Sequence, residues 1–353
     1  MDFSVDESPA AKALGPLFKL TEVHLWDDGS SEEAESSHVQ ESTTGYGTTS
    51  GKGKGSGRIN QRRPAEIADY MPDSTRGSEE EESRSPASVL NNSETLDQSD
   101  TLKNEIVAEI GCLPGASALS NEHEHDGEAL KLEYKDHLGV PVEIPSSISK
   151  YWLQRYLLFS RFDNGIKMDE EGWFSVTPEI LAKHHAERCG RGSVVDLFTG
   201  VGGNAIQFAQ WSRHVIAIDI DPIKIDYARH NAALYGVGER IDFIKGDSFS
   251  LAPKLKADVV FCSPPWGGPG YSKVTKFDIN TMLKPRDGKS LFDAGRRIAP
   301  KIVMFLPKNV DINQLAELSL SALPPWYLEV EKNYLNGILK TVTAYFCDPS
   351  SSL

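Results

Sequence analysis

Short apolar segments alternate with helix-like segments over the second half of the chain. SVVDLF at 193–198 and HVIAID at 214–219 are rich in β-branched residues, and NAIQFAQW at 204–211 has apolar residues at helical spacing. Short strands that alternate with helices are typical of a doubly wound parallel sheet. Further strands of this kind are expected in RIDFIKGD at 240–247, ADVVFCS at 257–263 and KIVMFLP at 301–307.

The end of the chain has a different pattern. WYLEVEKNYLNG at 326–337 and KTVTAYFCD at 340–348 resemble two adjacent strands, and Asn336-Gly337 lies between them. This dipeptide is a strong hairpin turn signal. We therefore expect an α/β fold with a C-terminal antiparallel hairpin at the edge of the sheet.

A helical extension is predicted in front of the sheet. In ISKYWLQRYLLFSRF at 148–162, Trp152, Tyr156 and Phe159 follow helical spacing, which indicates an amphipathic helix. After a loop, a second helix is expected to begin near Pro178, with Thr177 as its N-cap and the proline in its first turn.

The first part of the chain lacks apolar periodicity. Ser, Glu, Gly and Asp dominate from about residue 27 to residue 100. Such a composition cannot offset the entropy of ordering, so residues 1–140 are expected to be mostly disordered and of low complexity. Two islands interrupt it, a strand-like stretch at Leu17–Trp26 and a weakly helical one at Thr101–Leu113. Each could dock a partner or pack on the main domain.

The net charge of −14 is unevenly distributed. From Lys150 onward there are 25 Lys and Arg against 22 Asp and Glu, which gives +3. The remainder, 12 cations against 29 acids, gives −17 for residues 1–149. A nearly neutral C-terminal part can still hold a basic groove, because binding depends on the local field. The overall acidity therefore does not exclude a nucleic-acid partner.

Cysteine spacing and hydropathy narrow the class of protein further. The four cysteines show no CxxC spacing, which favours reduced thiols over a disulfide framework or a zinc site. His123 and His125 have no second ligand cluster nearby and are interpreted as solvated loop residues, so no metal is expected. No stretch approaches the roughly 20 apolar residues that cross a bilayer, and the N-terminus does not resemble a signal peptide. We expect a soluble intracellular protein without a membrane partner.

Acidic residues end three successive predicted strands. Asp196 precedes FTGVGGN, where Gly200, Gly202 and Gly203 allow close approach of a ligand before the next helix. Asp219, about 20 residues further on, is the group expected to bind ribose hydroxyls. Each signal has a structural alternative, since a glycine-rich turn can simply close a tight connection and a single Asp can cap a helix or form a turn. Asp247 ends the third strand, where its carboxylate could accept a hydrogen bond from an adenine amine. Three acidic strand ends in succession are poorly explained by accident.

The fourth strand ends in SPPWGGPGY. Its prolines make the loop rigid, and the motif is expected to leave Trp266 exposed, where a planar base could stack. A Trp in the core is the alternative, but the surrounding Pro and Gly residues disfavour it. The motif resembles the DPPY or NPPY signature of methyltransferases that act on amino groups of bases. Ser263 and the Pro264 carbonyl would then accept hydrogen bonds from an exocyclic amine.

Together with KYWLQRYLLFSRFDNGIKMDEEGWFSVTPE, these motifs closely resemble the trimethylguanosine synthase family, over about Ser149 to Cys347. The resemblance implies a Rossmann-like methyltransferase core at 191–349 and an extension at 141–190 that contributes to the active site. It implies S-adenosylmethionine as cofactor and two methyl transfers to the 2-amino group of a 7-methylguanosine cap, giving 2,2,7-trimethylguanosine. The expected substrates are capped small nuclear and nucleolar RNAs.

The resemblance also assigns roles to individual residues. Ser263, Pro264 and Trp266 are the expected catalytic positions, and Trp266 and Tyr271 are expected to bind the cap base. Lys150, Lys308 and Asn309 are expected at the cap phosphates, where relatives are expected to carry arginine in place of Lys308. The residues expected around the cofactor are Phe159, Thr177, Asp196, Gly200, Gly202, Asn204, Asp219, Asn231 and Asp247.

Two other functions stay open at this point, methylation of an internal RNA base and cap binding without catalysis. The expected location is the nucleus, in the nucleolus or Cajal body, with the cytoplasm as a second site. The chain is expected to be a monomer whose N-terminal region binds ribonucleoprotein partners. Residues 1 to about 130 are expected to be dispensable for activity on free cap analogues.

Overall fold

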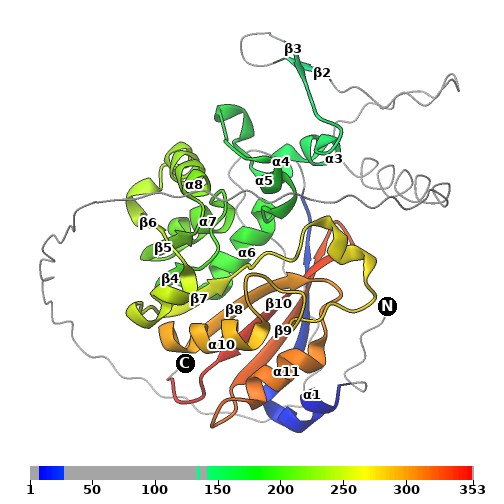
Figure 1. The fold of residues 1–353 in the computed structure, drawn as a ribbon, viewed down its shortest axis with the longest axis vertical. Helices are drawn as coiled ribbons and strands as arrows, with labels where there is room; N and C mark the ends of the chain where they lie inside the picture. The colour runs from blue at the N-terminus through cyan, green and yellow to red at the C-terminus, as the bar shows by residue number, and fades with distance from the viewer. Residues whose placement is uncertain (1–7, 28–132, 136–140, 352–353) are drawn as a thin grey trace, which may run out of the picture. The chain divides into compact units, whose positions relative to one another are not determined.

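A single mixed β-sheet organises the part of the chain that the structure describes. The computed structural model describes residues 8–27, 133–135 and 141–351 (Figure 1). All of them belong to a unit formed by residues 1–43 and 106–353. The eight strands lie in the order β1-β9-β10-β8-β7-β4-β5-β6. The strands are β1 Phe18–Leu25, β4 Ser193–Asp196, β5 His214–Asp219, β6 Ile241–Lys245, β7 Val259–Cys262, β8 Lys301–Pro307, β9 Tyr327–Leu335 and β10 Ile338–Cys347.

The strands from β6 to β8 form the predicted parallel sheet. β4 pairs in parallel with both β5 and β7, and β7 pairs in parallel with β8. Consecutive β4 residues face opposite sides, since Val194 packs in one apolar cluster and Val195 in the other. Both faces are therefore covered by helices, which is why these strands are continuously apolar.

Each face of the sheet has its own set of helices. One apolar cluster includes residues of α1, α10 and α11, and the other includes residues of α4 to α8. The α-helices are α1 Pro9–Leu14, α3 Ser149–Leu153, α4 Arg155–Leu158, α5 Glu170–Ser175, α6 Glu179–Cys189, α7 Gly203–Trp211, α8 Pro222–Leu234, α9 Ser248–Leu251, α10 Gly288–Ile298 and α11 Ile312–Leu320. Short elements complete the list: η2 Gly15–Leu17, η3 Phe162–Asn164, η4 Gly238–Arg240, η5 Ala252–Lys254, η6 Pro269–Lys273, and the separate two-stranded pair of β2 Glu133–Lys135 with β3 Pro141–Glu143.

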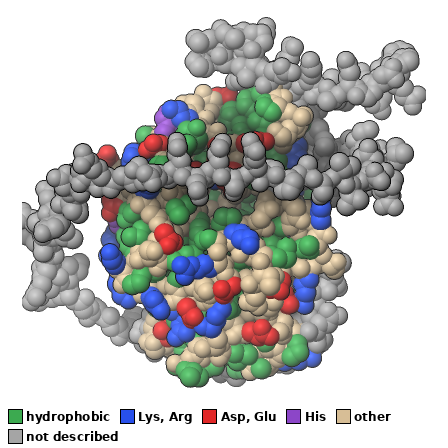
Figure 2. Space-filling view, viewed as in Figure 1, with side chains coloured by type: hydrophobic (Ala, Val, Ile, Leu, Met, Phe, Trp, Pro, Cys, Tyr) green, Lys and Arg blue, Asp and Glu red, His purple; other side chains and the backbone are tan. Residues whose placement is uncertain are grey.

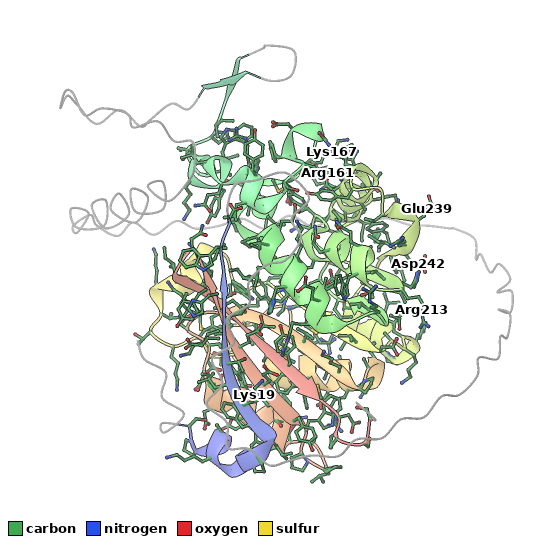
Figure 3. All side chains as sticks on the ribbon, turned by 180° about the vertical axis from the view of Figure 1, so that it is seen from behind. Lys19, Arg161, Lys167, Arg213, Glu239 and Asp242 are labelled. Carbon is green, nitrogen blue, oxygen red and sulfur yellow. The ribbon has the colours of Figure 1, made fainter. Side chains whose placement is uncertain are left out.

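The first described segment is part of the core, which corrects the expected boundary at residue 140. β1 pairs in parallel with β9 along its whole length, from Phe18 opposite Leu328 to Leu25 opposite Leu335. In Figure 3, Lys19 marks this edge strand and Asp242 marks β6 at the other edge. The sequence left this open because the segment is short. Its two apolar parts, α1 and β1, cannot form a core alone and are buried only by packing against the rest of the chain. The second island, Thr101–Leu113, and the two histidines at 123 and 125 lie outside the described residues.

Several contacts anchor this segment. Ala11, Leu14 and Val23 are almost fully buried, and the Asn313 side chain on α11 accepts hydrogen bonds from Ser8 and from the Ala10 N–H. Removing residues 1 to 130 would expose this part of the core. The burial and strand pairing of residues 8–27 argue against their being dispensable, and the expectation for the full 1–130 stretch stays a prediction.

The predicted hairpin exists, but it does not form the edge of the sheet. β9 and β10 are antiparallel, and Asn336 and Gly337 at the turn have φ values of 50° and 77°. Positive φ at both positions is the feature of the tight turns that Asn-Gly favours. β10 pairs with β8, and β1 covers the outer side of β9. The sequence pattern alone could not reveal this pairing, because β1 lies about 300 residues earlier in the chain.

The extension differs from the prediction in two places. The single amphipathic helix is divided at Gln154 into α3 and α4, and α5 forms within the expected loop. α6 begins at Glu179 with Pro178 at its N-cap position and no side-chain cap. Thr177 lies one residue before the N-cap and does not cap the helix; its hydroxyl instead accepts a hydrogen bond from Asn204 at 2.8 Å. Tertiary contacts therefore override the local capping signal.

Within the described residues, no helix has the length and apolar character that spanning a membrane requires. Cys189, Cys262 and Cys347 are free thiols. Burial raises the pKa of the Cys189 thiol to about 12. Cys189 and Cys262 are also fully enclosed, so both are expected to be unreactive.

We predict that the N-terminal segment contributes directly to stability. Leu14→Ala should lower the free energy of unfolding by about 2 to 5 kcal/mol, since it removes a buried side chain from the core. Lys19→Ala is the matched control on the same segment, where loss of an exposed ion pair with Glu329 should cost less than about 1 kcal/mol. Urea denaturation of the full chain measures both. Equal unfolding midpoints for the two variants would contradict a core role for residues 8–27.

Candidate active site

The loop between β4 and α7 is held by the carboxylate that ends β5. Asp219 accepts hydrogen bonds from the Gly200 N–H at 2.9 Å and from the Asp221 N–H at 3.0 Å. Gly200 and Gly202 have φ values of 53° and 95°, a conformation that favours glycine. A Cβ at Gly202 would also lie 3.1 Å from the Cα of Ala228 on α8. The loop therefore has a fixed shape, and Asp219 keeps acceptor capacity for a ligand because a carboxylate has about four lone-pair positions.

Asp196, at the end of β4, is a buried carboxyl with one unpaired oxygen. Its side chain is 1% exposed, and Oδ1 accepts a bond from the Phe198 N–H at 3.3 Å. Oδ2 has no hydrogen-bond partner among the described residues. Burial, with a further contribution from Asp219, raises the pKa of Asp196 to about 7. A ligand that presents a cation or hydrogen-bond donors to Oδ2 would satisfy it and favour its charged form.

A buried chain of polar side chains fixes the start of α7. Asn204 donates to the Thr177 hydroxyl, and its Oδ1 lies 3.5 Å from the Nδ1 of His185. Nε2 of His185 lies 3.0 Å from the Thr343 hydroxyl on β10. Burial lowers the pKa of His185 to about 3, so the ring is neutral at physiological pH. Thr177 and Asn204 thus lie together next to the glycine loop, as the prediction of a shared cofactor site requires.

The extension covers the glycine loop from the other side. A Cβ added to Gly203 would lie 2.6 Å from Cγ2 of Val176 and 4.0 Å from Cζ of Phe159. Phe159 is 2% exposed and packs against Tyr235 with ring centroids 6.3 Å apart. Phe159 therefore lies at the expected place but is enclosed, so any contact with a ligand would involve little of its surface.

The Asn231 side chain forms hydrogen bonds with the backbone of two neighbouring segments. This fully buried side chain accepts from the Lys167 N–H at 2.8 Å and donates to the carbonyls of Lys167 and Val201, both at 2.9 Å. It joins α8 to the extension and to the glycine loop. Its predicted direct contact with the cofactor stays a prediction, and these three bonds assign it a positioning role.

Asp247, after β6, is part of a local turn. It caps α9 by accepting from the Phe249 N–H at 3.1 Å and from the Ser250 hydroxyl at 2.7 Å. The Ser250 hydrogen bond is the main cause of its lowered pKa. Its expected hydrogen bond with an adenine amine stays a prediction. Arg286 lies above the Phe249 ring, 4.7 Å from its centroid.

The SPPW loop, residues 263–266, begins where β7 ends. Because β7 pairs in parallel with β4, this loop and Asp196 both lie at the carboxyl ends of the parallel strands, which we call the carboxyl edge of the sheet. Trp266 is half-buried rather than exposed, which corrects the expectation from its Pro and Gly neighbours. Its Nε1–H donates to the Phe305 carbonyl at 3.3 Å, and its ring contacts Tyr271 and Phe305 at centroid distances of 5.1 and 5.3 Å. The indole is therefore held in a fixed orientation, while Ser263 is half-buried and Pro264 buried at its side.

The residues expected at the cap phosphates surround this loop. The Asn309 side chain donates to the carbonyls of Tyr271 and Val274 at 3.3 and 2.7 Å, so it supports the loop that carries Tyr271. Lys308 is exposed next to it. Lys150 lies above the Tyr151 ring, 4.7 Å from its centroid. Burial raises the pKa of Tyr271, and Tyr151 on α3 lies close enough to raise it further.

Several supporting residues escaped the sequence analysis. Glu179 on α6 accepts bonds from the N–H and hydroxyl of Ser160, which follows α4, and from the hydroxyl of Tyr235, which follows α8. Lys224 pairs with Glu171 and lies 3.8 Å from Asp169, which ties α8 to α5. These pairs involve residues tens of positions apart, so no local motif identifies them.

The strand order, the antiparallel last strand and the two loops that begin at the carboxyl ends of β4 and β7 are those of a Rossmann-like methyltransferase fold. Residues 191–349 match the family model of the RNA cap guanine-N2 methyltransferases. The chain is 41% identical over 214 residues to trimethylguanosine synthase of Schizosaccharomyces pombe, and this alignment covers 58% of this chain and 87% of that protein. It is 38% identical over 247 residues to trimethylguanosine synthase of Saccharomyces cerevisiae, and this alignment covers 63% of this chain and 77% of that protein. The chain belongs to the trimethylguanosine synthase family.

We predict that Asp196 makes stability depend on pH. A carboxyl whose pKa is higher in the folded than in the unfolded state binds its proton more tightly when folded, so its contribution falls as pH rises from about 4 to about 7. Between pH 5 and pH 7.5 this loss is about 2.5 kcal/mol. Urea unfolding at the two pH values should show a smaller decrease for Asp196→Asn than for the unaltered protein. Identical decreases would show that Asp196 is ionised without penalty.

Proposed function

We propose that this chain transfers methyl groups from S-adenosylmethionine to the exocyclic 2-amino group of a 7-methylguanosine RNA cap, twice, to give 2,2,7-trimethylguanosine. The observation that carries the proposal is the pairing of β4 with β7. It brings the unpaired carboxyl oxygen of Asp196 and the oriented Trp266 to one edge of the sheet. A methyl donor and an aromatic acceptor can therefore be bound side by side.

The residues at the end of β4 and β5 suit the proposed cofactor. S-adenosylmethionine carries an ammonium group and ribose hydroxyls, and Asp196 and Asp219 offer acceptors for such groups. The rigid glycine loop lets the backbone approach closely. When bound, the cofactor supplies a methyl group on a sulfonium, which is an intrinsically good leaving group.

The SPPW loop suits a methylated guanine. The half-buried indole of Trp266 offers a stacking surface, and methylation at position 7 places a positive charge on the purine. A cation above an indole face gains about 0.5 to 2 kcal/mol, more when water is excluded. Ser263 and the Pro264 carbonyl would accept hydrogen bonds from the 2-amino group and so orient it.

Catalysis would depend mainly on placement. In-line transfer gains most from holding the amine and the methyl group at a near-attack distance of roughly 3 to 3.5 Å. The amine becomes acidic as it is alkylated, so its proton can pass to water or to a backbone carbonyl. We assign no general base, and Asp196 serves to bind and orient.

The family supports capped RNA as the substrate, and we propose small nuclear and small nucleolar RNAs in particular. We also propose that the protein acts in the nucleus, in the nucleolus or Cajal body, with the cytoplasm as a second site. Ribonucleoprotein partners would bind the acidic residues before 133, and the chain would act as a monomer. Immunofluorescence that found the full chain only outside the nucleus would contradict the location, and light scattering tests the monomer.

Two alternatives would give different results. A methyltransferase for internal RNA bases would not depend on a methylated cap. A cap-binding protein without catalysis would not bind S-adenosylmethionine, which calorimetry measures directly. The intact acidic strand ends and the formed glycine loop favour an active enzyme over the second alternative.

We predict that Asp219→Ala weakens binding of S-adenosylmethionine by roughly 10-fold to 150-fold, because hydrogen bonds to a charged group contribute about 1.5 to 3 kcal/mol. Affinity for a 7-methylguanosine cap analogue should change little. Asp242→Ala is the matched control, an exposed carboxylate on β6 that pairs with His214, and both affinities should be retained. Calorimetry gives both constants. Equal losses for the two ligands in Asp219→Ala would show that Asp219 supports only the fold.

We predict that Trp266 makes the enzyme require methylation at position 7. Trp266→Ala should abolish binding and turnover of the 7-methylated cap, while Trp266→Phe should retain part of both because a weaker aromatic face survives. The unaltered enzyme should turn over the unmethylated cap much more slowly. Steady-state kinetics with two caps and three proteins measures this, and cofactor binding confirms that each variant is folded. Similar turnover of both caps by the unaltered enzyme would favour the internal-base alternative.

A further inference from the structure

The loop that follows the SPPW motif carries an excess of positive charge. Residues 264–289 contain five Lys and Arg and two Asp, a net charge of +3 in a chain whose total is −14. On the face shown in Figure 2, Lys and Arg side chains are interspersed with Asp and Glu. A cation that already has a partner within the protein is less available to a ligand.

Three of the cations have partners. Lys276 lies 3.0 Å from the Asp311 carboxylate, Lys289 pairs with Asp293, and Arg286 lies above the Phe249 ring. The remaining two, Lys273 and Lys284, are exposed and form no ion pair with any residue in the described ranges.

The two acids of the loop are engaged in their own turns. Asp278 accepts hydrogen bonds from the Asn280 N–H and the Gln314 side chain, both at 2.8 Å. Asp287 caps α10 by accepting from the N–H and hydroxyl of Ser290. Each carboxylate is thus oriented toward local donors and forms no ion pair with Lys273 or Lys284.

Both lysines are fixed close to the proposed cap site. Lys273 ends η6, two residues after Tyr271, in the segment that the Asn309 side chain holds through the carbonyls of Tyr271 and Val274. The Lys284 N–H donates to the Pro265 carbonyl at 3.2 Å, next to Trp266. An RNA strand whose capped end is bound at Trp266 would therefore extend from the site close to Lys273 and Lys284.

We propose that Lys273 and Lys284 bind phosphates of the RNA strand beyond the cap. This inference rests on the proposed function, since it concerns the same substrate further along its chain. Contacts of this kind carry no sequence preference and depend on salt, because each neutralised phosphate of a single strand releases about 0.7 counterion. The enzyme would then prefer capped RNA to a free cap dinucleotide.

The test compares a 7-methylguanosine-capped oligonucleotide with the cap dinucleotide. In Lys273→Ala/Lys284→Ala, the KM for the capped oligonucleotide should rise about 10-fold at 0.15 M salt. The slope of log KM against log salt concentration should become smaller by about 1.4, because two phosphate contacts are lost. The KM for the dinucleotide and both kcat values should change less than about 2-fold. The control is Lys254→Ala/Arg297→Ala, which removes two exposed cations before the starts of β7 and β8, at the opposite edge of the sheet. It should leave both KM values unchanged.

The outcomes separate the two proposals. A loss confined to the oligonucleotide supports an RNA path along this loop. Equal losses for both substrates, or no loss for either, would overturn that path. Failure of the unaltered enzyme to methylate the dinucleotide would instead contradict the proposed function itself.

Discussion

The hydrogen bond from the Gly200 N–H to the Asp219 carboxylate is the interaction on which the proposed cofactor side of the site depends. It joins the loop after β4 to the end of the neighbouring strand β5. With the loop fixed, α7 begins where Asn204 can reach Thr177, and Val201 lies where Asn231 can bond its carbonyl. The extension, the glycine loop and α8 are therefore positioned together by a few buried polar contacts.

The N-terminal strand gives the sheet an unexpected edge. In the part of the chain that the structure describes, β1 covers β9, and the hairpin lies inside the sheet. Glu331 on β9 is buried and bonds His184 on α6 and the Tyr345 hydroxyl, and Lys332 is buried beside Glu22 of β1. Because buried charges require partners, β9 is stable in this position only with α6 on one side and β1 on the other.

Local sequence patterns predicted the parallel strands, the hairpin and the acidic strand ends, because those features depend on periodicity and on turn residues close together in the chain. They could not predict that β1 pairs with β9, since the pairing joins residues about 310 positions apart. The predicted site residues lie in or near the glycine loop and the SPPW loop, but the sequence did not reveal whether a side chain faces a ligand site or its own backbone. Asn231 and Asp247 use their polar atoms within the chain, and Trp266 is half-buried because Phe305 and Tyr271 pack against it.

The central claim is that the carboxyl end of the parallel strands holds a methyl donor and a 7-methylguanosine cap so that the methyl group passes to the 2-amino nitrogen of the cap. Mass spectrometry of the cap released after incubation of the full chain with S-adenosylmethionine and a 7-methylguanosine-capped RNA tests it directly. The account predicts that guanosine gains one methyl group and then a second, both on the 2-amino nitrogen. Methylation found only on internal bases, or no methylation by a protein that binds both ligands, would contradict it.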